Sequence, residues 1–183
     1  PNGSYMQTKE ITHHGTLIFP KISSNSNDEI IIANGEDRIM IYDPSISTQL
    51  CSITTRNMAV DQAFENRSGV IIASMCYRTV NMVRAYDRSG REGDTLTEDQ
   101  GEHLYAAVDN QDRVYVASVK IGPDTVVITQ YKMDGLKFKK ICQFEELKLA
   151  LCSTWWCYMV SLSCDMLAFA CNNKLYFIEV QPL

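Results

Sequence analysis

A hairpin pattern recurs along this chain and restricts its fold more than any other feature. In the clearest copy, Asp28–Asp43, the apolar run Ile30–Ala33 leads through Asn34-Gly35-Glu36-Asp37 into the run Arg38–Tyr42. Short apolar runs joined by such turn residues predict β-hairpins. Further copies begin at residues 69, 113 and 165. Their aligned alanines are 40, 44 and 53 residues apart: Ala33, Ala73, Ala117 and Ala170.

Self-similarity at a period of about 40 to 50 residues is typical of four-stranded sheets repeated around a common axis. The sequence therefore predicts an all-β fold, a β-propeller of four-stranded antiparallel blades within one domain, residues 1–183. The four predicted units span residues of about 19–55, 56–99, 100–148 and 153–183. An alternative is that these units are part of a six-bladed propeller.

The fourth unit has three predicted strands where the others have four, and residues 4–11 alternate loosely without a partner in sequence. We expect residues 4–11 to close the last blade, which covers a sheet edge that otherwise recruits other chains. The protein is then a monomer, or a dimer that exchanges this strand. Residues 145–151 are the one stretch of helix-favouring composition and are predicted as an irregular connection with about one helical turn.

Charge and cysteine content narrow the function classes. A net charge of −5 argues against binding nucleic acid through a broadly positive surface. No apolar stretch is long enough to cross a membrane as a helix. The seven cysteines contain no CxxC pair and lie mostly in apolar runs, which predicts free thiols and a cytoplasmic location.

Three stretches of the first unit resemble the NHL repeat: Phe19-Pro20, Asp28–Asn34 and Asp37–Asp43. NHL propellers are best known as C-terminal domains of tripartite-motif (TRIM) ubiquitin ligases. The resemblance implies a non-catalytic recognition domain, for a protein partner or for RNA. Two departures are that the family usually has six blades and that the turn before Arg38 is shorter than usual. No RING-type Cys/His array is present in residues 1–183, so ligase activity would lie outside them.

In a propeller of this chain order, the loops between units and the second-to-third-strand loops open on one face. This predicted face carries the candidate partner-binding residues His13, His14, Arg56, Asn57, Arg78, His103, Lys120 and Asn172. Acids are interleaved with them: Glu36, Asp37, Glu102 and Asp124. Because a phosphate-rich partner needs cations without interleaved acids, protein binding is favoured over RNA binding.

An enzymatic function would depend on inward-facing polar groups, because some propeller enzymes hold a metal in their central channel. The inner strands offer a thin set for this purpose: Ser23, Asp61, Glu65, Asp109 and Ser161. A three-histidine site would need His13, His14 and His103 to converge. No GxSxG, HExxH, P-loop or GxGxxG motif occurs. We therefore expect no catalytic residue, metal or cofactor, with a metal-dependent propeller enzyme as an alternative.

Overall fold

The structure is a computed structural model that describes residues 20–77, 80–97, 102–120, 124–149, 157–163, 165–171 and 174–180. All regular elements in these ranges are strands, which form four antiparallel sheets. The first sheet contains β1 (Lys21–Ser24), β2 (Ile30–Ala33), β3 (Arg38–Tyr42) and β4 (Gln49–Thr54). The second contains β5 (Ala59–Glu65), β6 (Ile71–Tyr77), β7 (Val80–Tyr86) and β8 (Glu92–Thr97).

The third sheet contains β9 (Glu102–Val108), β10 (Arg113–Lys120), β11 (Thr125–Asp134) and β12 (Lys137–Gln143). The short strand β13 (Leu147–Lys148) pairs with β11 in the same sheet. The fourth sheet contains β14 (Cys157–Ser163), β15 (Met166–Cys171) and β16 (Lys174–Glu179). Apart from β13, the strands of each sheet follow one another in chain order, so neighbouring strands form hairpins with short connections.

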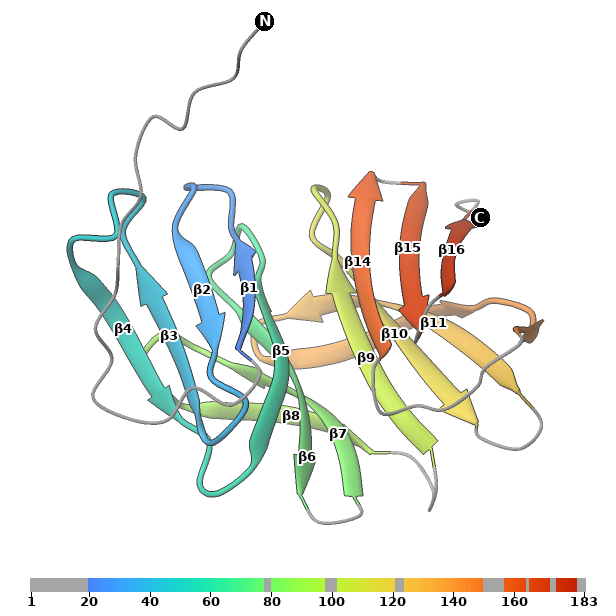
Figure 1. The fold of residues 1–183 in the computed structure, drawn as a ribbon, viewed down its shortest axis with the longest axis horizontal. Coiled ribbons are helices and arrows are strands. Elements are labelled where there is room, and N and C mark those ends of the chain that lie inside the picture. Colours follow the sequence, from blue (N-terminus) through green and yellow to red (C-terminus); the bar gives the residue numbers. More distant parts are fainter. Residues whose placement is uncertain are drawn as a thin grey trace, which may run out of the picture.

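The four sheets are arranged as the blades of a β-propeller, as the repeat predicted (Figure 1). The first strands of successive sheets contact one another: β1 with β5, β5 with β9, and β9 with β14. Two side-chain contacts cross the centre. Lys21 Nζ of β1 lies 5.3 Å from the centroid of the Tyr158 ring of β14. Gln62 Nε2 of β5 donates to the Met159 carbonyl of β14 at 3.3 Å.

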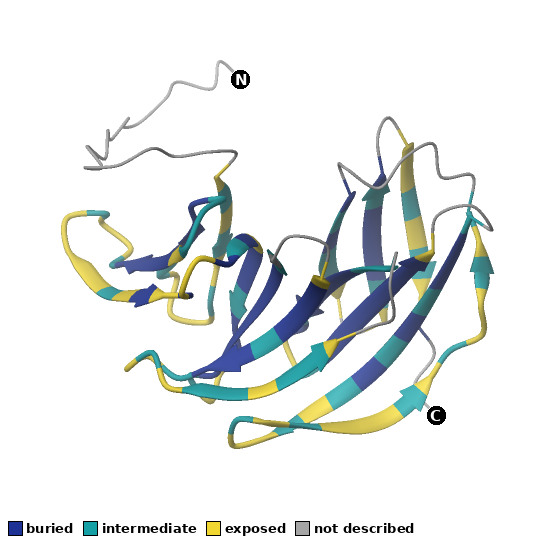
Figure 2. Cartoon of the chain, turned by 90° about the horizontal axis from the view of Figure 1, so that it is seen from below, coloured by how far each residue is buried: buried dark blue, intermediate teal, exposed yellow. Residues whose placement is uncertain are grey.

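Apolar side chains fill the spaces between neighbouring sheets, because both faces of a blade's central strands are covered. Ile31, Ile71 and Tyr86 belong to the core between the first and second sheets. Ile72 and Val114 belong to the core between the second and third sheets. The core between the third and fourth sheets contains the edge-to-face pair Tyr105 and Phe169, whose ring centroids are 6.1 Å apart. Figure 2 shows this burial in the middle of the sheets, with exposed residues at the loops and outer strands.

Two predictions for the chain ends and connections have different outcomes. The helical turn predicted within residues 145–151 is wrong for the part that the structure describes, because Leu147–Lys148 forms β13. Its register with β11 places Lys148 opposite Thr125. The closing strand predicted at residues 4–11 lies outside the described residues, so it stays a prediction.

Candidate functional site

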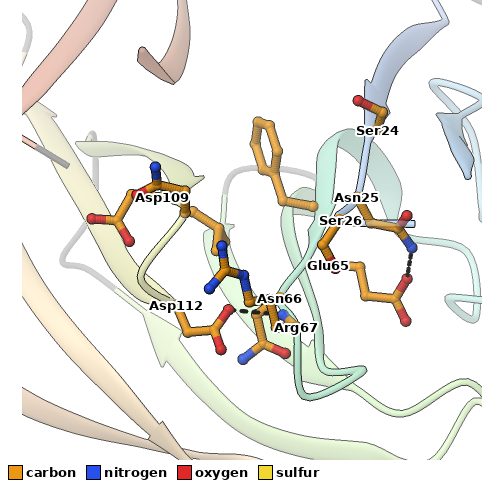
Figure 3. A pocket seen from close by; sticks show the side chains of 11 residues that line it. Ser24, Asn25, Ser26, Glu65, Asn66, Arg67, Asp109 and Asp112 are labelled. Atoms are coloured by element: carbon orange, nitrogen blue, oxygen red, sulfur yellow. Dashed lines mark hydrogen bonds between the residues drawn. The ribbon is translucent and has the colours of Figure 1, made fainter. Parts of the chain in front are cut away.

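A hollow of about 360 Å³ opens where the first-to-second-strand loops of the first three sheets meet (Figure 3). We call it the polar hollow. Its lining residues come from the ends of β1, β5 and β9 and from the loops that follow them: Ser24, Asn25, Ser26, Phe64, Glu65, Asn66, Arg67, Val108, Asp109, Asn110 and Asp112. Each of them lies at or close to a strand end, so their positions depend on the turns.

The same turn geometry recurs in all three loops. The side-chain oxygens of Asn25, Asn66 and Asp109 each accept a hydrogen bond from the backbone N–H four residues later, at 2.9 to 3.1 Å. Three residues after each of them, the backbone is left-handed: φ is 59° at Asp28, 78° at Gly69 and 63° at Asp112. Asp, Asn and Gly tolerate this conformation, and a side chain that bonds its own backbone stabilises it. The polar hollow is therefore bordered by three turns of defined shape.

Glu65, at the edge of the hollow, is held by a cation from the β7–β8 turn. Its side chain is 1% exposed, and Arg88 donates to it through Nε at 2.6 Å and through Nη2 at 2.8 Å. Arg88 also bonds Glu29, and Asn25 Nδ2 donates to both carboxylates at 2.6 Å. The hydrogen bond from Arg88 lowers the pKa of Glu29, and the bonds to Glu65 and Glu29 raise the pKa of Arg88. This cluster joins the first sheet to the second.

On the third-sheet side of the hollow, one acid forms an ion pair, and other polar groups face outward. Arg113 Nε donates to the buried Asp109 Oδ2 at 2.6 Å. Asp112 Oδ1 accepts from the backbone N–H of Arg67 at 2.8 Å, which joins the loops of the second and third sheets (Figure 3). The Arg67 side chain is exposed, and no acid of the described residues pairs with its guanidinium. On this side of the hollow, Arg67, Asn110 and Asp112 are accessible polar groups, and Ser24 and Ser26 are exposed on the first-sheet side.

The predicted face lies at the other end of the inner strands. Arg56 and Asn57 precede β5, whereas Glu65 ends that strand beside the polar hollow. Both residues are left-handed, with φ of 54° and 68°. Backbone hydrogen bonds pin their turn to the β2–β3 turn, from Thr55 N to the Asp37 carbonyl at 2.7 Å and from Val60 N to the Glu36 carbonyl at 2.8 Å. The Arg56 guanidinium is 3.7 Å from Glu92.

His103 and Lys120 form a separate group on the third sheet. They are near neighbours because β9 pairs with β10, and Lys120 Nζ is 2.8 Å from Glu102. Burial lowers the pKa of His103. The remaining predicted residues, His13, His14, Arg78 and Asn172, lie outside the described residues. Both described cations of the predicted face are therefore paired with acids, which reduces their availability to phosphate.

The inward-facing set considered for an enzyme is largely occupied by internal contacts. Ser23 Oγ donates to the Ala63 carbonyl at 2.7 Å, and Ser161 Oγ donates to the Ser163 carbonyl at 2.9 Å. Glu65 and Asp109 are bound by arginines. Asp61 differs, since desolvation raises its pKa to about 6 although Lys21 partly opposes the shift. Among the described residues, no group of three or more His, Cys, Asp or Glu side chains is placed to hold a metal ion.

The polar hollow was not among the sequence-based candidates, although its turns were. The compositions of the stretches 66–69 and 109–112, Asn-Arg-Ser-Gly and Asp-Asn-Gln-Asp, are typical of turns, and the structure forms turns there. Their shared signal is an Asn or Asp at the end of three inner strands, at Asn25, Asn66 and Asp109. That signal indicates one common end of the propeller, opposite to the predicted face.

The geometry defines an all-β propeller with a polar, mixed-charge hollow at one end of its inner strands. No protein-family model matches the chain, and no curated protein is significantly similar to it in sequence. Among solved structures, it resembles a catalytically inactive virginiamycin B lyase from Staphylococcus aureus, crystallised with quinupristin. The identity is 10% and the TM-score is 0.48, over 94% of this chain and 73% of that chain. At this similarity, the fold assignment rests on the sheets themselves.

Proposed function

We propose that this chain is a non-catalytic recognition module that binds a protein partner through the polar hollow. The observation that carries the proposal is the rim of three repeated turns around a hollow whose buried acids are already paired with arginines. Arg67, Asn110 and Asp112 remain to contact a partner, and together they offer a cation, an amide and an anion. Mixed polar groups on a rigid scaffold suit the varied surface of a protein.

The contacts of the acids support binding over catalysis. A general acid or base needs a carboxyl group that can exchange protons with a substrate. Glu65 and Asp109 instead serve as acceptors for Arg88 and Arg113 at 2.6 Å, which gives them a structural role. Separating a buried carboxylate from its arginine leaves a charge without compensation, and this is costly.

The resemblance to NHL repeats suggests what kind of partner this is. We propose a substrate or regulator of a TRIM-type ubiquitin ligase, with the ligase activity in residues outside this chain. A cytoplasmic location fits the five described cysteines, which are free thiols. No helix in the described ranges has the length and apolarity to span a membrane.

RNA is the alternative partner, and the ion pairs on the predicted face argue against RNA binding. Arg56 and Lys120 of the predicted face are both engaged with glutamates, at 3.7 and 2.8 Å. An RNA-binding surface releases counterions when its cations meet phosphates, which makes affinity fall steeply with salt. Cations that are already paired with acids provide little of this driving force.

The test compares charge reversals at the two ends of the inner strands. The first variant carries Arg67→Glu and Asp112→Lys at the polar hollow, and the matched variant carries Arg56→Glu and Lys120→Glu on the predicted face. Partners are captured on each immobilised chain, with cross-linking mass spectrometry to map the contact. We expect protein capture, contacts mapped to the hollow, and loss of capture with the first variant only. If only the matched variant lost capture, the binding site would lie on the predicted face and not at the polar hollow. Capture of RNA in place of protein would overturn the proposal.

A further inference from the structure

A second hollow, of about 450 Å³, adjoins the polar hollow and shares Asn66 and Asp112 with it. It lies between the β5–β6 loop and the outer strands of the third sheet. Its other lining residues are Ser68, Gln111, Arg113, Gln130, Tyr131, Lys132, Met133 and Ile141. Ile141 is 57% exposed and places an apolar side chain at this hollow. We call this second site the basic hollow.

Three cations form one row across the third sheet at the basic hollow. The strand registers place Arg113 of β10 opposite Lys132 of β11, and Lys132 opposite Lys139 of β12. Like charges directly opposite each other destabilise a sheet. The outer two are compensated, because Arg113 pairs with Asp109 at 2.6 Å and Lys139 with Asp134 at 2.5 Å. Lys132, between them, forms no ion pair with an acid of the described residues.

The charge around this row is positive although the chain as a whole is acidic. The basic hollow and the adjoining β11–β12 hairpin carry five cations, Arg113, Lys132, Lys137, Lys139 and Lys140. Arg113 lies beside Asp109 and Asp165, and Lys139 pairs with Asp134, whereas Lys132, Lys137 and Lys140 form no ion pair among the described residues. The pKa of Asp134 is lowered, by its hydrogen bond with Lys139 first and also by the fields of Lys137 and Lys132.

Protection of a sheet edge explains only part of this pattern. Lysines on an outer strand keep it from pairing with other chains, and this accounts for Lys137, Lys139 and Lys140 on β12. It does not account for Lys132, which lies on β11 inside the sheet. Nor does it account for an exposed Ile141 next to those lysines, since an apolar side chain opposes solubility.

We propose that the basic hollow binds an extended acidic segment of the partner that carries one bulky apolar side chain. The apolar side chain packs on Ile141, while flanking carboxylates meet Lys132 and the β12 lysines. Opposite charges across an interface supply orientation and fast association, and the apolar anchor supplies buried area. This inference rests on the proposed protein-binding function and specifies the partner's chemistry.

Direct binding of short probes to the full 183-residue chain tests the proposal. The probes are the fluorescein-labelled peptides Glu-Asp-Leu-Glu-Asp, Glu-Asp-Ser-Glu-Asp and Lys-Lys-Leu-Lys-Lys, and a labelled oligo(U) RNA, measured by fluorescence anisotropy. We expect the acidic leucine peptide to bind best, and the Lys132→Glu variant to weaken it roughly tenfold. Ile141→Ser should reduce binding of the leucine peptide to the level of the serine peptide. The control Lys148→Glu makes the same charge change at the far end of β11 and should leave binding unchanged.

Three outcomes would overturn the inference. Equal binding of the leucine and serine peptides would show that the apolar side chain does not contribute to binding. Equal loss in Lys132→Glu and Lys148→Glu would show an effect of net charge alone. Tighter binding of oligo(U), lost in Lys132→Glu, would identify a phosphate surface instead. Failure here is distinguishable from failure of the proposed function, because capture of a protein through Arg67 and Asp112 does not depend on Lys132.

Discussion

Asp61 combines an exposed side chain with surroundings that disfavour its charge. It is the extra residue of a bulge in β5, where the register with β6 shifts between Val60 and Gln62. Neighbouring protein groups remove much of the water around the carboxyl, and this desolvation raises its pKa to about 6. Lys21, which also lies over the Tyr158 ring, opposes the shift without cancelling it.

This pKa predicts a pH dependence of stability. Between about pH 4, the ordinary value of an aspartate, and pH 6, the folded chain binds more protons at Asp61 than the unfolded chain does. Stability conferred through this group is therefore lost as pH rises through that range. We expect Asp61→Asn to raise the melting temperature at about pH 7 while leaving it nearly unchanged at about pH 4. Thermal unfolding followed by circular dichroism across this pH range measures the effect.

The control for Asp61 is Asp37→Asn, a surface aspartate that lies 3.9 Å from Arg38. It should keep the wild-type dependence on pH. If Asp61→Asn melts in parallel with the wild type at every pH, the carboxyl is fully solvated and its surroundings do not disfavour its charge.

The turn-forming residues show how far local sequence determines the site. Asn66 and Asp109 end inner strands 43 residues apart, and each organises a turn through its own side chain. Such turns are predictable because the interaction is local. Their convergence on one hollow is not predictable from local sequence, because it depends on how neighbouring sheets are placed. The same limit applies to Lys132. Its alignment with Arg113 and Lys139 can be recognised only when the strand registers are known.

At the scale of elements, neighbouring blades are joined by ion pairs as well as by apolar cores. Arg88, in the β7–β8 turn, reaches Glu65 at the end of β5 and Glu29 before β2. Glu65 is almost fully buried, whereas 38% of the Arg88 side chain is exposed. Removing one partner of such a pair leaves a buried charge without compensation, which costs more than the pair itself contributes.

We therefore expect Arg88→Ala to lower the free energy of unfolding by roughly 2–3 kcal/mol, less than for a fully buried pair because water reaches Arg88. Adding Glu65→Gln should recover part of this loss, since the uncompensated charge is then removed. Urea denaturation of the three chains measures the differences.

Arg91→Ala is the matched control, because its pair with Asp87 at 3.0 Å is on the surface and 73% of its side chain is exposed. Exposed pairs contribute about 0–1 kcal/mol. Equal effects of Arg88→Ala and Arg91→Ala would contradict the assigned role of Arg88 between the first two sheets.

Strand positions were predictable to within a few residues, and the exceptions come from pairing. In the third unit, the run Val126–Tyr131 predicts a strand that ends at Tyr131. The strand β11 continues to Asp134, because Asp134 pairs with Lys137 across Gly135 and Leu136. Gly135 is left-handed there, with φ of 56°. The two residues of β13 are too few to show a period, so their strand state comes from contact with β11 alone.

At the scale of the whole molecule, the outer edges of the sheets differ in character. The edge strand β12 carries three lysines and β8 carries two acids, which discourages pairing with other chains. The edge strand β16 instead exposes Leu175 by 57% and Phe177 by 62%. Val180 N bonds the Asp165 carbonyl, so the antiparallel alternation turns the backbone groups of Leu175 and Phe177 away from β15.

Such an edge can pair with an additional strand, and residues 4–11 are the segment that we expect to pair with it. We expect a chain that lacks residues 1–12 to melt at a lower temperature and to self-associate, because the edge of β16 is then free to pair between molecules. Differential scanning fluorimetry and analytical ultracentrifugation measure the two effects. Adding Leu175→Lys and Phe177→Lys to the truncated chain should restore the monomer without restoring the melting temperature, since charge blocks association but supplies no strand. A truncated chain that stays monomeric and melts with the full chain would exclude residues 4–11 as the closing strand.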